Sequence, residues 1–207
     1  MAKLSIIIPV HNMGDQLNQC LAAIRNTVRF PYEMIIVDDG PSKDAGIVVT
    51  AAGDDVRILR SAERHGFSHA VNAGLRASVG EVLLFLHADV LLAPHTAEDM
   101  LDALIENPTV GAVSAVASRT YERSRVAPPS EYRSWEEFAA VAEELRARES
   151  ALYPEILAEM FALMVRRDAA EAAGFLDEQF TVPALAAYDY TIRMTRAGYG
   201  IASLMGA

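Results

Sequence analysis

Apolar residues in the first hundred positions follow two patterns in alternation. Runs rich in Ile, Val and Leu, with no regular polar residues between them, are typical of strands covered on both faces. Such runs occupy Leu4–Val10, Met34–Val37, Val56–Leu59 and Val82–Leu86. Between them, apolar residues recur at helical spacing, over 68–77, over 96–106 and in the stripe Leu17, Cys20, Leu21, Ile24 and Val28. Strands that alternate with helices predict a Rossmann-like α/β fold around a parallel sheet.

The second half of the chain is less regular. A fifth strand is predicted over Val110–Ala117, and the arginine- and proline-containing segment Ser118–Ser130 is typical of an exposed loop. Ser134 and Glu137 have the spacing of a capping box, which predicts a helix start. The other predicted elements are an apolar run at Met160–Val165, a turn at Gly174 and a last helix over Asp189–Ala197 that ends at Gly198.

Composition excludes several classes of protein. A chain of 207 residues with 52% hydrophobic residues fits one globular domain, and no apolar run is long enough to span a bilayer. The N-terminus is typical of a first strand rather than of a signal peptide. Cys20 is the single cysteine, so no intrachain disulfide can form and a cytoplasmic location is expected. The net charge of −10 disfavours nucleic-acid binding, but it allows a phosphorylated ligand if a cation bridges the two.

Polar residues follow the predicted strands where each strand ends. His11 and Asn12 follow the first strand, Asp38 and Asp39 the second, and the segment His87–Asp89 the fourth. Ligands of parallel α/β sheets bind at the carboxyl ends of the strands, so we expect these residues to line one crevice. An ionised carboxylate at the end of an apolar strand costs several kcal/mol if it is buried without a partner, which favours a pairing or metal-binding role for Asp89.

Several motifs resemble one known family. The segments "SIIIPVHN" at 5–12, "MIIVDDG" at 34–40, "RHGFSHAVNAGLRASVGEVLLFLHAD" at 64–89, and "GFLDEQF" and "YDYTIRMTRAGYG" further on are similar to family 2 glycosyltransferases. The resemblance implies the GT-A fold, a three-layer α/β/α sandwich around a mostly parallel sheet. It also implies that residues 1–117 bind a nucleotide sugar and that 118–207 form the acceptor-facing half of the same domain.

The resemblance assigns roles to residues by position. It implies that Pro9 and His11 frame a nucleobase, that Asp39 accepts a hydrogen bond from it, and that Asp38 supports the ribose. The segment between His65 and Asn72 would close over the nucleotide.

The resemblance makes Asp89 the last acid of a metal-binding Asp-x-Asp signature, with Mn2+ or Mg2+ as the cation. His87 stands in place of the first acid, either as a ligand suited to manganese or as a contact to ribose or phosphate. Each acid also has a structural interpretation: Asp89 as a helix cap, and Asp38 and Asp39 as turn residues before Gly40.

The general base is where the sequence departs from the family. An inverting transferase needs a carboxylate to take the proton of the acceptor hydroxyl. The family places this acid in a Glu-Asp-x-Asp stretch, where this chain has Ala187 at the usual base position and keeps only Asp189. Asp189 is the predicted base, and Asp177 or Glu178 are alternatives.

The chain also stops soon after Tyr199, so the later strand and metal-binding histidine of many relatives are expected to be absent. The chain would then be a minimal catalytic domain, a fragment of a longer protein, or one that has lost its activity.

The motifs leave three candidate functions. The predicted one is an inverting, metal-dependent glycosyltransferase that uses a nucleoside-diphosphate sugar and an unidentified glycan, lipid-linked or protein acceptor. The alternative is a module of the same fold that binds a nucleotide sugar or a protein without turnover, which Ala187 favours. A nucleotidyltransferase would need a glycine-rich, basic phosphate loop after the first strand, and "PVHNMGDQ" lacks one.

Overall fold

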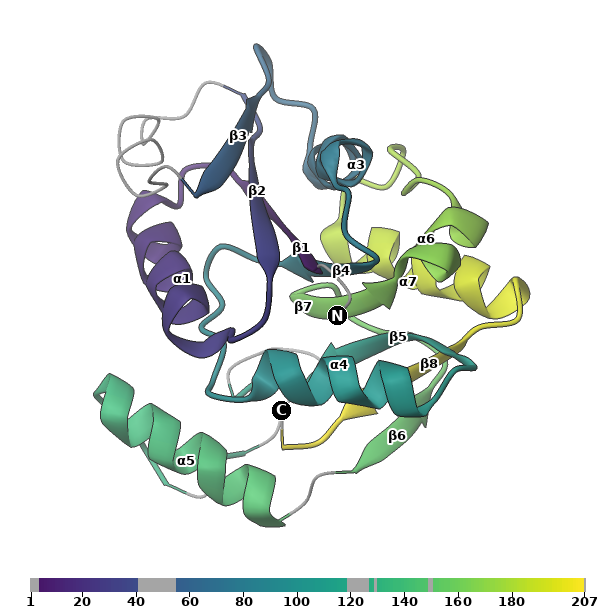
Figure 1. Ribbon diagram of the computed structural model, residues 1–207. Helices are drawn as coiled ribbons and strands as arrows, with labels where there is room; N and C mark the ends of the chain where they lie inside the picture. The colour runs from purple at the N-terminus through teal and green to yellow at the C-terminus, as the bar shows by residue number, and fades with distance from the viewer. Residues whose placement is uncertain (1–3, 41–54, 119–126, 129, 149–150, 207) are drawn as a thin grey trace.

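The computed structural model describes residues 4–40, 55–118, 127–128, 130–148 and 151–206. Within these residues one eight-stranded sheet has the order β3-β2-β1-β4-β7-β5-β8-β6 (Figure 1). The strands are β1 Leu4–Val10, β2 Tyr32–Asp38, β3 Val56–Arg60, β4 Val82–Leu86, β5 Val110–Ala115, β6 Leu152–Glu155, β7 Ala162–Arg166 and β8 Gly200–Leu204. Strands β3, β2, β1 and β4 are parallel, as are β5 and β8, whereas β7 is antiparallel to β4 and β5, and β6 to β8.

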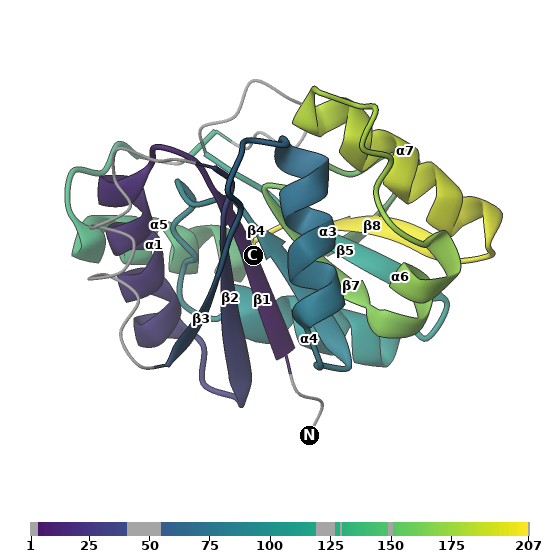
Figure 2. The same cartoon turned by 90° about the horizontal axis from the view of Figure 1, so that it is seen from above.

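Helices cover both faces of the sheet (Figure 2). They are α1 Gly14–Thr27, α3 Phe67–Ala77, α4 Thr96–Glu106, α5 Trp135–Arg148, α6 Arg167–Ala173 and α7 Pro183–Arg196. Successive side chains of a strand point to opposite faces, so Ile6 and Ile8 of β1 pack in the cluster that includes α1 and α4. Ile7 between them packs in the cluster that includes α3, α6 and α7. The three-layer α/β/α arrangement around a mostly parallel sheet is therefore confirmed.

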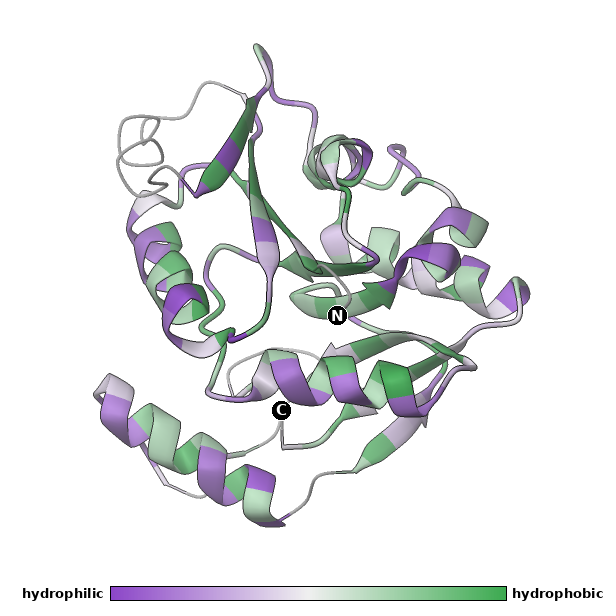
Figure 3. Cartoon of the chain, in the orientation of Figure 1, coloured by the Kyte–Doolittle hydropathy of each residue, from purple (hydrophilic) through white to green (hydrophobic). Residues whose placement is uncertain are grey.

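The apolar pattern matches the observed core closely. Figure 3 shows hydrophobic residues concentrated on the central strands and on one side of the helices. Gly74 allows α3 to lie close against β1, because a Cβ at this position would be 2.3 Å from Cγ2 of Ile7. The second half of α3 is thereby packed closely on the sheet.

The elements in the first hundred residues agree with the predictions. β1, β4 and α4 have the predicted bounds, and β2, β3, α1 and α3 differ from them by a few residues at most. In the second half, Ser134 caps α5 through a 3.2 Å hydrogen bond from the backbone N–H of Glu137. The Glu137 carboxylate accepts from the N–H of Arg133 rather than from that of Ser134, so the capping box is only half formed.

In the second half two predictions were wrong and one strand was missed. The last helix begins at Pro183 rather than at Asp189, because proline fits the first turn of a helix and the following alanines continue it. Strand β8 follows Tyr199 directly, so the expected absence of a later strand is wrong. The short strand β6, which pairs with β8, was not predicted at all.

No described helix combines the length and the apolar character that crossing a bilayer requires. The predicted cytoplasmic location stays a prediction.

Candidate functional site

The carboxyl ends of β1, β2 and β4 meet at one edge of the sheet, because β1 pairs with both of the other strands. The ring Nδ1 of His11 lies 3.0 Å from the carbonyl oxygen of Asp39, and the N–H of Asp39 donates to the carbonyl of Val10. Pro9 is in β1 opposite Val37 of β2. The structure therefore brings the polar ends of the first two strands into contact.

Asp39 ties the end of β2 to the start of α3. Its buried carboxylate accepts hydrogen bonds from the backbone N–H groups of His65, at 3.0 Å, and Gly66, at 2.7 Å. Gly66 has a φ of 101°, a backbone conformation that glycine adopts without strain. In this conformation the N–H groups of His65 and Gly66 both point towards the Asp39 carboxylate. Asp39 thus has an anchoring role that the sequence did not indicate, beside any role in binding a base.

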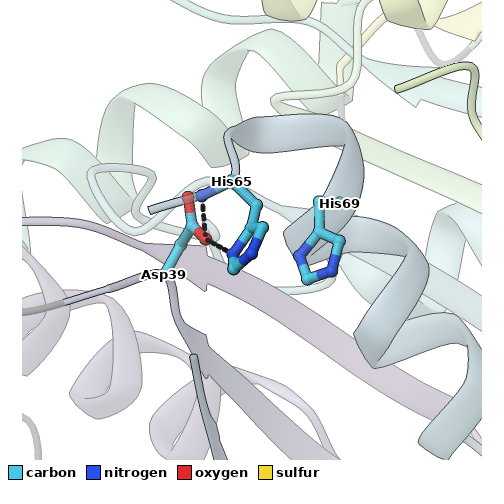
Figure 4. A group of neighbouring side chains, drawn as sticks. All are labelled: Asp39, His65 and His69. Carbon is cyan, nitrogen blue, oxygen red and sulfur yellow. Dashed lines mark hydrogen bonds and ion pairs between the residues drawn. The ribbon is translucent and has the colours of Figure 1, made fainter. Parts of the chain in front are cut away.

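Two imidazoles lie next to this carboxylate (Figure 4). Nδ1 of His65 is 3.9 Å from an Asp39 oxygen, and the rings of His65 and His69 are stacked with their centroids 4.3 Å apart. One potential ligand atom from each of Asp39, His65 and His69 lies within 4.8 Å of the others. No role was predicted for His69, which lies in the first turn of α3, while His65 precedes the N-cap Gly66.

Asp38 is the last residue of β2 and is almost fully buried. Its Oδ2 is 3.4 Å from Nε of Arg60, while its Oδ1 has no hydrogen-bond partner in the described part of the chain. Burial raises the pKa of this carboxyl, and Arg60 and His11 oppose the rise. A buried acceptor without a partner is unusual and fits a site that receives a donor, such as a hydroxyl, from a ligand.

Asn72 is buried and uses its amide within the protein. Its Nδ2 donates to the carbonyl of Leu176, at 2.9 Å, and to the carboxylate of Glu178, at 2.8 Å. Its Oδ1 accepts from the N–H of Leu176 at 2.8 Å. Both amide hydrogens are therefore engaged, so a donor bond from Asn72 to a nucleotide would require one of these bonds to break.

His87 and Asp89 follow the end of β4. The His87 ring packs edge-on against Phe67, with 5.3 Å between the ring centroids, and the backbone N–H of His87 donates to the carbonyl of Phe161. Burial lowers the pKa of the His87 imidazole and Asp89 opposes this, so a neutral ring able to bind a cation is favoured near pH 7. Asp89 lies in an exposed turn.

A cavity of about 740 Å³ opens beside these two residues. It is bounded by α5, the ends of β4 and β5, and the start of α7, and apolar side chains such as Phe138, Leu145 and Phe161 form much of its wall. The buried acid Glu159 also lines it. No role was predicted for Glu159, although it stands directly before a buried apolar run, as Asp89 stands just after one.

The predicted base lies on α7 away from this wall. The carboxylate of Asp189 is 2.8 Å from Nε of Arg193, one turn further on, and Arg193 also donates to the carbonyl of Ala173. At this end of α7 the cavity is lined by the N-cap residue Val182 and by Pro183 and Ala184 of the first turn. Ala187 is fully buried in the cluster beside Tyr190, so its methyl group belongs to the core.

The alternative acids are on the surface loop before α7. Asp177 accepts from the N–H of Gln179, and Glu178 accepts from Asn72. Both side chains are exposed in this loop and neither lines the cavity.

Solved structures share the fold of this chain. The mannosyltransferase PcManGT from Pyrobaculum calidifontis, solved with GDP-Man and Mn2+, matches with a TM-score of 0.69 at 21% identity, over 98% of this chain and 56% of that one. TarS from S. aureus matches with a TM-score of 0.68 at 16% identity, over 98% of this chain and 58% of that one. The fold is that of the GT-A glycosyltransferases.

The sequence comparison identifies the family. The family described as Glycosyl transferase family 2 matches residues 5–173, and the chain belongs to this family. An uncharacterized glycosyltransferase of Haemophilus influenzae is 32% identical over 107 residues, which are 52% of this chain and 36% of the relative. Glycosyltransferase AglE of Haloferax volcanii is 33% identical over 97 residues, 44% of this chain and 31% of the relative. The chain thus spans about a third of the length of these curated relatives.

Proposed function

We propose that the chain transfers a sugar from a nucleoside-diphosphate sugar to an acceptor hydroxyl, with inversion at the anomeric carbon and with Mn2+ or Mg2+ as cofactor. The observation that carries the proposal is the position of His87 and Asp89, which stand at a central strand end and on the wall of the large cavity. Family membership and the neighbour that holds GDP-Man and Mn2+ support it.

The nucleoside end of the donor is assigned to the ends of β1 and β2. Pro9 and His11 border this region, and Asp39 would accept a hydrogen bond from a ring nitrogen of the base. Asp38 has a buried oxygen without a hydrogen-bond partner among the described residues, which suits a ribose hydroxyl. His65 borders the same region, because its backbone N–H donates a hydrogen bond to the Asp39 carboxylate.

The cation is assigned to Asp89, with His87 as a second ligand or as a contact to the sugar phosphates. These residues fit the group: an exposed carboxylate is a hard oxygen donor, and a neutral imidazole suits manganese better than magnesium. When bound, a divalent cation neutralises the charge that develops on the departing diphosphate. Asp89 would fix the height of the diphosphate above the sheet, and the turn after β4 leaves its carboxylate accessible.

The acceptor is assigned to the cavity between α5 and the sheet, which residues 118–207 line together with the segments that follow β4 and β5. Its aliphatic and aromatic wall would exclude water from the reacting hydroxyl and would favour an acceptor with an apolar part. The acceptor therefore lies next to Asp89 in this scheme.

Two acids compete for the role of general base. Asp189 occupies the last position of the family motif, but Arg193 holds its carboxylate at 2.8 Å. Glu159 is buried and lines the same cavity as Asp89, which places an acid beside the expected acceptor. General-base catalysis is worth roughly 10²–10⁴-fold in rate, so the loss of the true base in Asp189→Asn or Glu159→Gln would lower kcat by that factor.

A non-catalytic module is the second candidate. Ala187 favours it, because a buried methyl group replaces the usual acid and cannot accept a proton. This module would bind the donor at the same place without turning it over, so binding and turnover must be measured separately.

The binding experiment is titration calorimetry of uridine, guanosine and thymidine diphosphates with and without Mn2+. We expect one of them to bind more tightly with Mn2+, and Asp89→Ala to weaken this binding by at least about tenfold, or roughly 1.4 kcal/mol. Asp102→Ala is the matched control, because Asp102 is an exposed acid on α4. Equal affinity of wild type and Asp89→Ala in the presence of Mn2+ would contradict the metal assignment.

Turnover is measured as hydrolysis of the sugar donors that correspond to the bound nucleotide. Release of nucleoside diphosphate that depends on Mn2+ and is reduced in Asp189→Asn or Glu159→Gln would support the transferase. Tight binding with no release in wild type would favour the module.

A further inference from the structure

We propose that Asp39, His65 and His69 form a second cation site, selective for zinc-like transition metals and separate from the site at Asp89. The ligand atoms of the three side chains lie within 4.8 Å of one another. They come from the end of β2 and from the start of α3, two segments that the backbone hydrogen bonds to Asp39 hold together (Figure 4).

The geometry needs only a small adjustment to close around a cation. Zinc bonds to nitrogen and oxygen are about 2.0–2.2 Å, so tetrahedral ligand atoms lie roughly 3.3–3.6 Å apart. The donor atoms here lie within 4.8 Å of one another, so they would have to approach by up to about 1.5 Å to reach that spacing. The side chain of His65 is 45% exposed and therefore free to turn towards the carboxylate.

The supporting interactions also resemble those of metal sites. Ligating carboxylates are commonly held by hydrogen bonds from the surrounding protein, and Asp39 accepts two from backbone N–H groups. The buried Nδ1 of His69 has no hydrogen-bond partner in the described ranges of the chain. A cation bound to Nδ1 of His69 would give this nitrogen a partner, as would a water molecule that the cation holds.

The ligand set determines which cation is expected. Two imidazoles and one carboxylate favour zinc and its neighbours such as cobalt, whereas magnesium prefers oxygen ligands alone. The three side chains leave a fourth tetrahedral position open to water or to a ligand atom.

The site is distinct from Asp89 because β1 lies between β2 and β4 in the sheet. Strands are about 4.8 Å apart, so two strand spacings separate the ends of β2 and β4 by roughly 10 Å. One ion cannot be bound at both places.

The site has a consequence that rests on the proposed function. Asp39 is the carboxylate assigned to the nucleobase, so a cation on it would compete with the base. Zinc would then inhibit donor binding at one end of the crevice, while manganese supports it at the other.

The test uses Co2+ as a spectroscopic probe on the metal-free chain, because imidazole-bound Co2+ has a visible absorption band. We expect one equivalent to bind, and His65→Ala and His69→Ala each to weaken binding by at least about tenfold. His95→Ala is the matched control, since His95 is an exposed imidazole at the N-cap of α4 that pairs with Glu143. Circular dichroism verifies that each variant is folded. An unchanged band in both His65→Ala and His69→Ala, no band in wild type, or loss of the band in Asp89→Ala would overturn the proposal.

Competition is tested with Zn2+ against the diphosphate that binds in the presence of Mn2+. We expect Zn2+ to weaken nucleotide binding in wild type and to have less effect in His69→Ala. Simultaneous, independent binding of Zn2+ and nucleotide would refute the competition. A Co2+ band without any nucleotide binding would leave the cation site standing and would refute the proposed function instead.

Discussion

Asn72 provides a quantitative test of how the crevice is built. In Asn72→Ala, the buried N–H and carbonyl of Leu176 both lose their partner. Each buried polar group left without a partner costs about 1–3 kcal/mol. With the bond to Glu178 also lost, we expect the free energy of unfolding to fall by about 3–5 kcal/mol. For a chain of this size, that corresponds to a drop in Tm of roughly 6–20 °C.

The assay is chemical denaturation followed by circular dichroism, with a double-mutant cycle as the control. Asn72→Asp keeps the shape but places a carboxylate against Glu178, so it should also destabilise the fold. In the double variant Asn72→Asp with Glu178→Gln, the glutamine amide can donate a hydrogen bond to the new carboxylate. We expect the double variant to recover about 1 kcal/mol of the free energy of unfolding lost in Asn72→Asp, and Glu178→Gln alone to cost little. A loss below about 1 kcal/mol in Asn72→Ala would refute the reasoning. Reduced nucleotide affinity without loss of stability would instead point to direct contact with the nucleotide.

Three further predictions concern stability. Tyr190→Phe should leave the free energy of unfolding unchanged or raise it by about 1 kcal/mol, because the buried hydroxyl has no hydrogen-bond partner among the described residues. Urea denaturation measures this, and a loss above about 1 kcal/mol would contradict it. Gly74→Ala should lower the Tm through a clash with Ile7, at a cost of about 1–3 kcal/mol, and an unchanged Tm would show that α3 can move away. The raised pKa of Asp38 means that the folded state binds its proton more tightly than the unfolded state, so stability should fall as the pH rises from 3.8 through the raised pKa. Asp38→Asn should remove this part of the pH dependence of the free energy of unfolding while weakening nucleotide binding, and an unaltered pH profile would refute the burial effect.

The first half of the fold was predictable because its strands are continuous apolar runs. β1 and β4 contain little besides Ile, Leu, Val and Phe, so burial on both faces follows from composition alone. β8, with the sequence Gly-Ile-Ala-Ser-Leu, has no such pattern and is a strand because β5 and β6 pair with it. The seven-residue helix α6 is rich in alanine and likewise has no clear apolar stripe.

The candidate site was predictable only as a set of strand ends. The order of the strands brings the ends of β1, β2 and β4 together, and alternation of strands and helices implies such an order. The two hydrogen bonds between the Asn72 amide and the backbone of Leu176 join residues 104 positions apart, and nothing local in the sequence indicates them. The anchoring of His65 and Gly66 by Asp39 depends in the same way on a tertiary approach of α3 to β2.

The central claim is that Asp89 holds the cation that binds a nucleoside diphosphate. It is tested most directly by a crystal structure of the chain with Mn2+ and the diphosphate that binds most tightly, using anomalous scattering to locate manganese. The account predicts a manganese peak at the Asp89 carboxylate, in contact with the diphosphate and beside the large cavity. A peak confined to Asp39, His65 and His69, or a diphosphate bound away from the end of β4, would contradict it.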